Sequence, residues 1–370
     1  MTLTTFAYLL GGLVLLIGGA EMLVRGAARL AAQFGIPPLI IGLTVVAFGT
    51  SAPETAVSVQ AAFNGTGDLA VGNVLGSNIA NILLILGFSA MVAPLSVSRQ
   101  LVRFDVPLMI GVSLLAWVLA NDGSFGRLDG LLLFGGVVTY TAFLIISSRR
   151  EKAAAGKDEF AEEYGLDAPP KPYAWAVNLG LLIVGVVLLI GGSNLLVEGA
   201  VALAKALGLS ELVIGLTVIA VGTSLPELAT SMIAAYKGER DIAVGNVVGS
   251  NLFNLLCVLG LTSLVSPLPI NVSANALAFD FPVMIAVAVA CLPIFFAGYR
   301  INRGEGALFA AYYVVYTVWL IMDNNGAPGL ATFSQAMRWF VLPLTALALL
   351  VIGGRAWRLQ RLKTSPPLGD

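Results

Sequence analysis

Long apolar segments recur along this chain, and they constrain its fold more than any other feature. A helix needs about 20 mostly apolar residues to cross the hydrocarbon core of a bilayer. Such runs lie near residues 4–24, 36–62, 69–93, 105–120, 128–147, 174–197, 211–235, 242–266, 280–297, 304–322 and 335–354. A membrane barrel would instead show segments of about ten residues with alternating polarity. The sequence therefore predicts an all-α integral membrane protein with eleven spanning helices.

The composition excludes a soluble globular protein. The chain is 58% hydrophobic and 11% charged, whereas soluble domains are about 45–50% apolar and about 25% charged. It has no histidine, so the usual proton shuttle is missing. Cys257 and Cys291 fall inside apolar runs, where we expect small buried side chains and no disulfide. No nucleophile paired with a base is visible, so we expect neither an enzyme nor a cofactor.

The basic residues predict the orientation in the membrane. With an extracellular N-terminus, all of the 20 Lys and Arg residues except Arg127, Lys205 and Arg338 fall on the cytoplasmic side. Positive charge near helix ends fixes the orientation of helices joined by short loops. We therefore expect the N-terminus outside and the C-terminus inside.

Two copies of one pattern make up most of the chain. The segment GLTVVAFGTSAPE (42–54) returns as GLTVIAVGTSLPE (215–227), and DLAVGNVLGSNIANILLILG (68–87) returns as DIAVGNVVGSNLFNLLCVLG (241–260). The offset is the same for both, since 227 − 54 = 173 and 254 − 81 = 173. Each copy holds five predicted helices, and because five is odd the second copy must enter the membrane from the opposite face. Inverted repeats of this kind are typical of secondary transporters.

The duplication divides the chain into four predicted parts. They are a first five-helix repeat (1–147), a cytoplasmic linker (148–172), a second, inverted five-helix repeat (173–322), and an additional transmembrane helix with a basic cytoplasmic tail (323–370). The linker is rich in charged residues and ends in prolines, which is typical of a solvated connection. The last helix has no counterpart in the first half, so we expect it at the periphery.

The repeated GTSxPE motif interrupts two apolar runs. Glycine and proline weaken a helix, and the residue before proline is driven out of the helical region, so we expect a break near residues 50–52. Hydroxyl, carbonyl and carboxylate oxygens in this stretch are hard donors that suit calcium or sodium. Those donors belong to Ala47, Thr50, Ser51 and Glu54 in the first copy and to Ala220, Thr223, Ser224 and Glu227 in the second.

The two glutamates need a counter-charge. A carboxylate in mid-membrane costs about 2.5–3.5 kcal/mol, and the inverted symmetry would bring Glu54 and Glu227 together. No Lys or Arg lies in these apolar stretches, so a cation or bound protons must neutralise them. The alternative is a kinked helix whose glutamate is protonated and bonded to a neighbour.

The second repeated motif, GNxxGSNxxN, adds polar groups to two further runs. Its glycines have the spacing that lets helices approach closely, so we expect them to serve packing. Packing does not explain four side chains that stand four apart on one helical face and would complete a coordination shell, namely Ser77, Asn81, Ser250 and Asn254. Asn73 and Asn246 fit equally a bond between helices or a place behind the ligands. Asp105 and Asp280 begin predicted helices, where we expect them to compensate the helix dipole.

At these motifs the sequence resembles the calcium/cation antiporter superfamily, and specifically a prokaryotic sodium/calcium exchanger, over residues 10–322. The resemblance implies ten core helices, with ion sites between the second, third, seventh and eighth. It also implies that the first and sixth helices slide past a rigid core. By the same resemblance, calcium is held by Thr50, Glu54, Thr223 and Glu227. The sodium sites then include Ala47, Ser51, Ser77 and Asn81 with their counterparts Ala220, Ser224, Ser250 and Asn254.

One position departs from the family pattern. Sodium/calcium exchangers often carry Asp at the position of Asn254. This chain has Asn at both repeat-equivalent positions, Asn81 and Asn254. Two carboxylates remain, which one calcium ion neutralises. The same departure argues against the potassium-dependent exchangers of the family, because the resemblance implies that they carry an additional acidic ligand at this position.

We therefore expect a secondary antiporter that exchanges Na+ for Ca2+ in a bacterial inner membrane. An exchanger of H+ for Ca2+ or another divalent cation is the alternative, because carboxylates bind either competitor. A passive channel is a third hypothesis, but channels usually build their filters from rings contributed by several subunits. Besides these ions and the lipid bilayer, no nucleic acid or protein partner is predicted.

Overall fold

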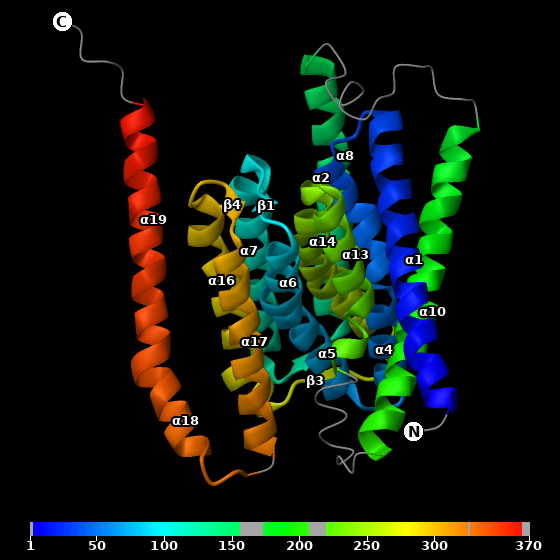
Figure 1. Ribbon diagram of the computed structural model, residues 1–370. Coiled ribbons are helices and arrows are strands. Elements are labelled where there is room, and N and C mark those ends of the chain that lie inside the picture. Colours follow the sequence, from blue (N-terminus) through cyan, green and yellow to red (C-terminus); the bar gives the residue numbers. More distant parts are fainter. Residues whose placement is uncertain (1–2, 156–172, 207–219, 325, 365–370) are drawn as a thin grey trace, which may run out of the picture.

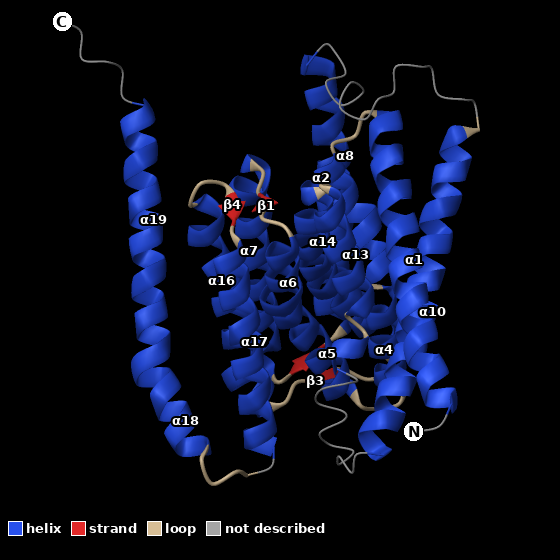
Figure 2. Ribbon diagram, in the orientation of Figure 1, coloured by secondary structure: helices blue, strands red, loops and turns tan. Residues whose placement is uncertain are grey.

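Long helices that run alongside one another make up the molecule (Figures 1 and 2). The computed structural model describes residues 3–155, 173–206, 220–324 and 326–364. Within these ranges eight helices are long and apolar enough to cross a membrane, or nine if a pair bent by 45° counts as one span. The prediction of a helical membrane protein is confirmed.

Two of the eleven predicted spans are not among these nine. The run at 211–235 begins outside the described part of the chain, which omits 207–219. The run at 335–354 lies within continuous helix from Leu330 to Thr364, whose described apolar part is Leu342–Ile352.

The helices follow the order of the two repeats. In the first half they are α1 (Leu3–Phe34), α2 (Pro38–Ile41), α3 (Ala47–Thr50), α4 (Ala52–Phe63), α5 (Gly67–Ala80), α6 (Gly87–Val92), α7 (Val106–Leu119) and α8 (Arg127–Ala155). In the second half they are α10 (Ala174–Ala206), α12 (Ala220–Gly222), α13 (Leu225–Lys237), α14 (Arg240–Phe253), α15 (Gly260–Val265), α16 (Phe281–Phe296) and α17 (Arg303–Asn324). The chain continues through α18 (Leu330–Ala336) and α19 (Leu342–Thr364).

Several helices are joined end to end by short π-helical turns. These are η1 (Gly42–Val46), η2 (Asn81–Leu86), η3 (Leu101–Asp105), η6 (Asn254–Leu259), η7 (Ala276–Asp280) and η8 (Met337–Val341), and a 3-10 turn, η4 (Ala120–Asp122), follows α7. The turns η2 and η6 are equivalent under the repeat, as are η3 and η7. Turns of the π type are rare in proteins and are frequent at functional sites.

Two short antiparallel ribbons join the halves. Strand β1 (Leu95–Ser96) pairs with β4 (Arg300–Ile301), and β2 (Ser124–Phe125) pairs with β3 (Ile270–Asn271). Each ribbon takes one strand from each half. The duplication is therefore visible in the pairing as well as in the sequence.

Helices α1 and α10 are equivalent in the two repeats and lie side by side at one edge of the molecule (Figure 1). A Cβ atom on Gly19 would lie 2.8 Å from the carbonyl oxygen of Gly185, and one on Gly192 would lie 2.9 Å from that of Gly12. The two backbones therefore touch, which only glycine permits. The contacts run in opposite sequence directions, so this pair is antiparallel, as inverted repeats require. The glycines recur every seven residues, at Gly12, Gly19 and Gly26 and at Gly185, Gly192 and Gly199.

An ionic cluster links α1 to α13. Glu21 on α1 pairs with Arg25 one turn later and with Lys237 at the end of α13. The repeat places Asn194 and Asn64 at the positions equivalent to Glu21 and Lys237, since 194 − 21 = 173 and 237 − 64 = 173. The mirrored positions therefore lack the Glu–Lys pair, and Glu198 stands where the repeat would place the equivalent of Arg25.

Two spans form the interior. The apolar window of Arg240–Val265 is 100% buried and that of Gly67–Val92 is 72% buried, against 17–44% for the other six. Gly245 and Gly249 let α14 approach α2 and η1, since added Cβ atoms would meet the oxygens of Leu39 and Leu43 at 2.9 and 2.7 Å. This confirms the packing role predicted for Gly245 and Gly249. The same prediction is wrong for Gly72 and Gly76, since a Cβ atom added to either would have no described heavy atom within 4 Å.

The expected role of Asp105 is wrong. Asp105 does not begin a helix but ends η3, which continues directly into α7, and its side chain is fully buried. The same role expected for Asp280 is also wrong, because Asp280 ends η7, which continues directly into α16. The phenol of Tyr140 donates a hydrogen bond to it at 3.0 Å, and Tyr316 donates to Asp280 at 3.5 Å. Each carboxyl thus accepts a hydrogen bond from the long helix that follows, α8 or α17. The helix start was predicted too late, because the helical segment begins before the apolar run does.

The remaining expectations concern the periphery. Cys257 and Cys291 are free and buried, as predicted. Helix α19 lies at the edge opposite α1 and α10 and packs against α16 (Figure 1). Of the predicted linker 148–172, the first residues continue α8 and 156–172 lie outside the described residues.

Candidate ion-binding site

Both GTSxPE motifs break a helix, as the sequence predicts. The chain leaves helical geometry at Ser51 (φ −81°, ψ 10°) and at Ser224 (φ −88°, ψ 6°), and a new helix starts at the following residue. The segments Pro38–Thr50 and Ala52–Phe63 meet at 45°. Glu54 and Glu227 lie in the first turns of α4 and α13, where the positive end of the helix dipole favours a carboxylate.

The two breaks are joined crosswise. The hydroxyl of Ser51 donates to Oε1 of Glu227 at 3.2 Å, and the hydroxyl of Ser224 donates to Oε1 of Glu54 at 3.4 Å. A serine before a helix usually caps its own first turn, but neither serine does so here. Each hydroxyl serves the glutamate of the other repeat, so the two acids are brought to one place.

Asn81 and Asn254 complete the same region. Each is 1% exposed and stands at the first residue of a π-helical turn, η2 or η6. The turn η2 packs against α13, and η6 packs against α4. The hydroxyl oxygens of Ser77 and Ser224 lie 3.3 Å apart, within hydrogen-bond distance, which ties α5 to the second break. The four segments named by the family resemblance therefore meet.

Buried oxygens without a hydrogen-bond partner concentrate here. Within the described ranges they include Glu54 Oε2, Glu227 Oε2, Asn81 Oδ1, Asn254 Oδ1 and Ser250 Oγ. Neither glutamate forms an ion pair with a described side chain. Unpartnered buried acceptors are costly, and five oxygens from two symmetric halves are the donor set that hard cations prefer. The residues present therefore fit a cation as substrate.

Asn73 and Asn246 brace the site from behind. Asn246 donates to Ser231 at 2.9 Å and accepts the hydroxyl of Thr50 at 3.1 Å. Asn73 donates to Ser58 at 3.0 Å and accepts the hydroxyl of Thr223 at 3.5 Å. Both roles that the sequence left open are observed, since each asparagine bonds to a neighbouring helix and also to a predicted threonine ligand.

The other predicted residues are placed as follows. The carbonyl of Ala47 accepts the amide of Ser51 at 3.0 Å, so it is already bonded, and the hydroxyl oxygen of Thr50 lies 3.3 Å from it. Thr50 is fully buried, whereas Thr223 is half-buried. Ala220 begins α12, the first described residue after the gap at 207–219.

Sequence reasoning missed Asn78 and Asn251. Both are 1% exposed, and each bonds across the repeat to a predicted ligand. Their position in GSN, beside the predicted serine ligands, was a visible signal. Their partners belong to the other repeat, so motif spacing alone could not identify the role.

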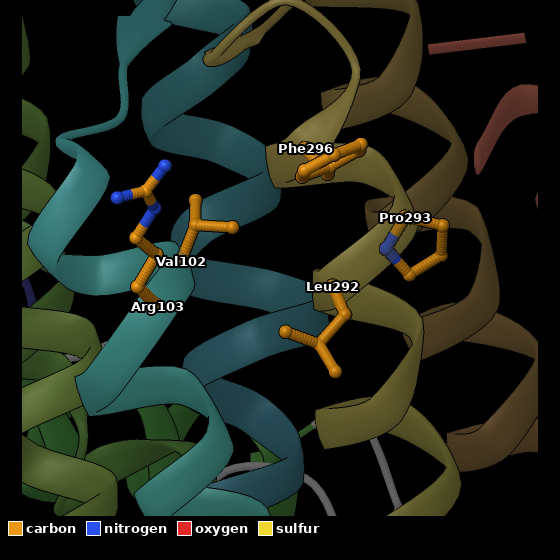
Figure 3. A pocket seen from close by; sticks show the side chains of 5 residues that line it. All are labelled: Val102, Arg103, Leu292, Pro293 and Phe296. Atoms are coloured by element: carbon orange, nitrogen blue, oxygen red, sulfur yellow. The ribbon is translucent and has the colours of Figure 1, made fainter. Parts of the chain in front are cut away.

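A cavity of about 300 Å3 lies elsewhere, between η3 and α16 (Figure 3). Its lining is Val102, Arg103, Leu292, Pro293 and Phe296. Apolar walls and a guanidinium do not suit a cation, and none of the predicted ligands lines it. The candidate site is therefore the polar cluster between α4, α5, α13 and α14.

Comparison with known proteins gives concordant results. The sequence matches the family model described as "Sodium/calcium exchanger protein" over residues 4–147 and 177–322. The inner membrane protein YrbG of Escherichia coli is 40% identical over 322 residues, covering 85% of this chain and 95% of YrbG. The sodium/calcium exchanger MaX1 of Methanosarcina acetivorans is 33% identical over 347 residues, covering 86% and 99%. The solved structure of the sodium-calcium exchanger NCX_Mj matches with a TM-score of 0.73 and 30% identity, covering 86% of this chain and 100% of that one.

Proposed function

Because this chain belongs to the sodium/calcium exchanger family, we propose that it is an antiporter that exchanges Na+ for Ca2+ by alternating access. Both cations are substrates. The proposal includes five helices in each inverted repeat, an appended last helix, the N-terminus outside and the C-terminus inside. It places the protein in the bacterial inner membrane.

The observation that carries the proposal is the crossed pair of glutamates. Glu54 and Glu227 are each 1% exposed, and each keeps one carboxylate oxygen without a partner among the described residues. Two negative charges close together are tolerated only if positive charge lies between them. One divalent cation or two monovalent cations supply the same charge, so the site suits exchange of one kind for the other.

The ligand assignment follows the donors. Calcium is assigned to the carboxylates of Glu54 and Glu227 with the hydroxyls of Thr50 and Thr223. A hydroxyl that donates its hydrogen keeps lone pairs for a cation, so the hydrogen bonds of both threonines are compatible with this role. The sodium sites are assigned to Ala47, Ser51, Ser77, Asn81, Ala220, Ser224, Ser250 and Asn254.

The moving element is assigned to α1 and α10. Their glycine contacts make them one unit at the edge of the molecule. This unit contacts α3, α12 and α13, which carry the broken-helix motifs. Sliding of the unit along these segments would uncover the site first on one side and then on the other.

Reconstituted protein tests the proposal. Liposomes loaded with Na+ and diluted into Na+-free buffer containing Ca2+ should accumulate Ca2+, whereas liposomes with Na+ on both sides should not. Ca2+ uptake in response to a pH gradient alone, with no response to Na+, would show that the protein exchanges H+ and not Na+ for Ca2+.

The second candidate is H+/Ca2+ exchange in the same site. It is favoured by the two carboxylates, since each can take a proton in place of a metal charge. A channel is separated from both exchangers by counterflow, because a channel needs no exchanging ion on the far side.

A further inference from the structure

Four asparagine side chains form two matched pairs behind the candidate site. The Nδ2 atom of Asn81 donates to Oδ1 of Asn251 at 3.0 Å, and Nδ2 of Asn254 donates to Oδ1 of Asn78 at 3.0 Å. All four side chains are 1% exposed. Each pair joins one residue from each repeat, so the arrangement occurs twice.

The direction of these bonds is fixed by a second set of contacts. Asn78 donates its own amide to the backbone oxygen of Asn251 at 3.2 Å and to the sulfur of Met284 at 3.6 Å. Asn251 donates to the sulfur of Met109 at 3.5 Å. Because their NH2 groups are engaged there, Asn78 and Asn251 present only oxygen to Asn254 and Asn81.

This orientation decides what Asn81 and Asn254 offer the ion. An asparagine presents either an oxygen acceptor or an NH2 donor, and only the oxygen can bind a cation. With the NH2 groups held from behind, the Oδ1 atoms of Asn81 and Asn254 are the ones left without a partner in the described chain. The opposite rotamer would direct two N–H groups at the cation.

We propose that Asn78 and Asn251 are positioning residues that hold the carbonyl oxygens of Asn254 and Asn81 toward the transported cation. The inference rests on the proposed function, because it requires a cation in this site. It assigns a role across the repeats, so each half sets the ligand of the other. Asn78 and Asn251 do not touch the ion themselves.

A coupling experiment separates positioning from simple packing. Purified Asn251→Ala, Asn81→Ala and the double variant are titrated with NaCl and, separately, with CaCl2, and thermal stabilisation gives the half-saturating concentration. Each single variant should raise that concentration for Na+ by about three- to tenfold, as expected for loss of one oriented ligand. The double variant should match Asn81→Ala, because Asn251 acts only through Asn81. Asn78→Ala and Asn254→Ala repeat the test in the other half.

Two further sets of variants guard against loss of the fold. Asn178→Ala removes a buried amide that bonds to Gln33, and it should leave the half-saturating concentrations unchanged. Met109→Leu and Met284→Leu conserve volume. Met109→Leu removes the sulfur acceptor of Asn251 and should raise the half-saturating concentration by about twofold, in keeping with a weak acceptor. Met284→Leu should have a smaller effect, because the amide of Asn78 keeps its bond to the backbone oxygen of Asn251.

The outcomes are distinct. Effects of Asn251→Ala and Asn81→Ala that multiply in the double variant, or a half-saturating concentration that does not move, would overturn the positioning role. A wild-type protein that Na+ does not stabilise would instead refute sodium as a substrate, and the CaCl2 titrations of the same variants would then decide the positioning role.

Discussion

Glu54 and Glu227 are the residues on which the site depends most. Each lies in the first turn of a helix that starts after a break, and each accepts a hydroxyl from the other repeat. A buried charge left without its partner costs about 3–5 kcal/mol. In the proposed function, binding of a cation by this pair and stability of the site should therefore depend on each other.

Neutralising either acid should abolish transport. We expect Glu54→Gln and Glu227→Gln each to reduce Ca2+ uptake into liposomes by more than about 100-fold, because a loss of about 3 kcal/mol in binding corresponds to that factor. Glu305→Gln is the matched control, since Glu305 is half-buried at the start of α17, away from the candidate site, and accepts the amide of Asn302 at 2.7 Å. Near-normal exchange in both site variants would contradict the assignment.

At the scale of residues, the motifs predict which residues belong to the site better than they predict which of them bond to each other. The offset of 173 is enough to match Glu54 with Glu227 and Ser51 with Ser224. It does not show that Ser51 bonds to Glu227 rather than to its own helix, because contacts between repeats depend on tertiary packing. Asn78 and Asn251 were missed for the same reason.

At the scale of elements, glycine spacing sets how closely α1 and α10 approach. A Cβ atom on Gly19 would meet backbone at 2.8 Å, whereas the neighbouring Gly18 has no heavy atom within 4 Å of such a Cβ among the described residues. The two glycines therefore differ in function although they are adjacent.

This pair of glycines offers a matched test. Gly19→Leu should force the helices apart and lower the free energy of unfolding by about 1–3 kcal/mol, the usual cost of overpacking. Gly18→Leu should leave it nearly unchanged. Thermal unfolding of both variants in detergent measures the difference, and equal stability would show that the backbones do not need this contact.

Helix boundaries were the least predictable part of the fold. The length of the apolar runs identified the spans. The π-helical turns at Asn81 and Asn254 could not be predicted, because a π-helical turn does not change the hydropathy of the sequence. Asp105 was misplaced because the helix before α7 begins in a polar stretch, SRQLVRFD, which hydropathy alone does not assign to a span.

At the scale of the whole molecule, the duplication accounts for most of the architecture. The crossed ribbons, the antiparallel α1 and α10 and the mirrored hydrogen bonds all follow from one repeated sequence. The symmetry fails where the sequences diverge, and the cluster of Glu21 with Arg25 and Lys237 is such a place.

Removing this cluster should change the ratio of the two conformations proposed for transport, in which the site is open to one side of the membrane or to the other. The side chains of Glu21 and Lys237 are 31% and 24% exposed, and an exposed pair is worth up to about 1 kcal/mol, which is about fivefold in a population ratio. Spin labels at the exposed Val14 and Tyr236, in a chain with Cys257→Ala and Cys291→Ala, would report the distance between α1 and α13. Lys237→Gln should change the ratio of the populations at the two label distances by up to about fivefold.

The control for this change is supplied by the repeat. Asn194→Glu, Glu198→Arg and Asn64→Lys together place the same charges at the mirrored positions, because Glu198 is the repeat equivalent of Arg25. These substitutions in the natural chain should return the ratio toward equality. A ratio that neither set of variants moves would show that the cluster has no influence on the balance.

An unloaded carrier with identical halves would spend equal time open to each compartment. In the alternating-access cycle proposed above, the unmatched cluster on α1 should remove that equality and give the empty protein a preferred resting side. It cannot set the direction of net flux, since a fixed bias performs no work and the gradients alone drive transport. It decides instead which compartment supplies the first ion of each cycle, so apparent affinities measured from the two faces should differ even though one site serves both.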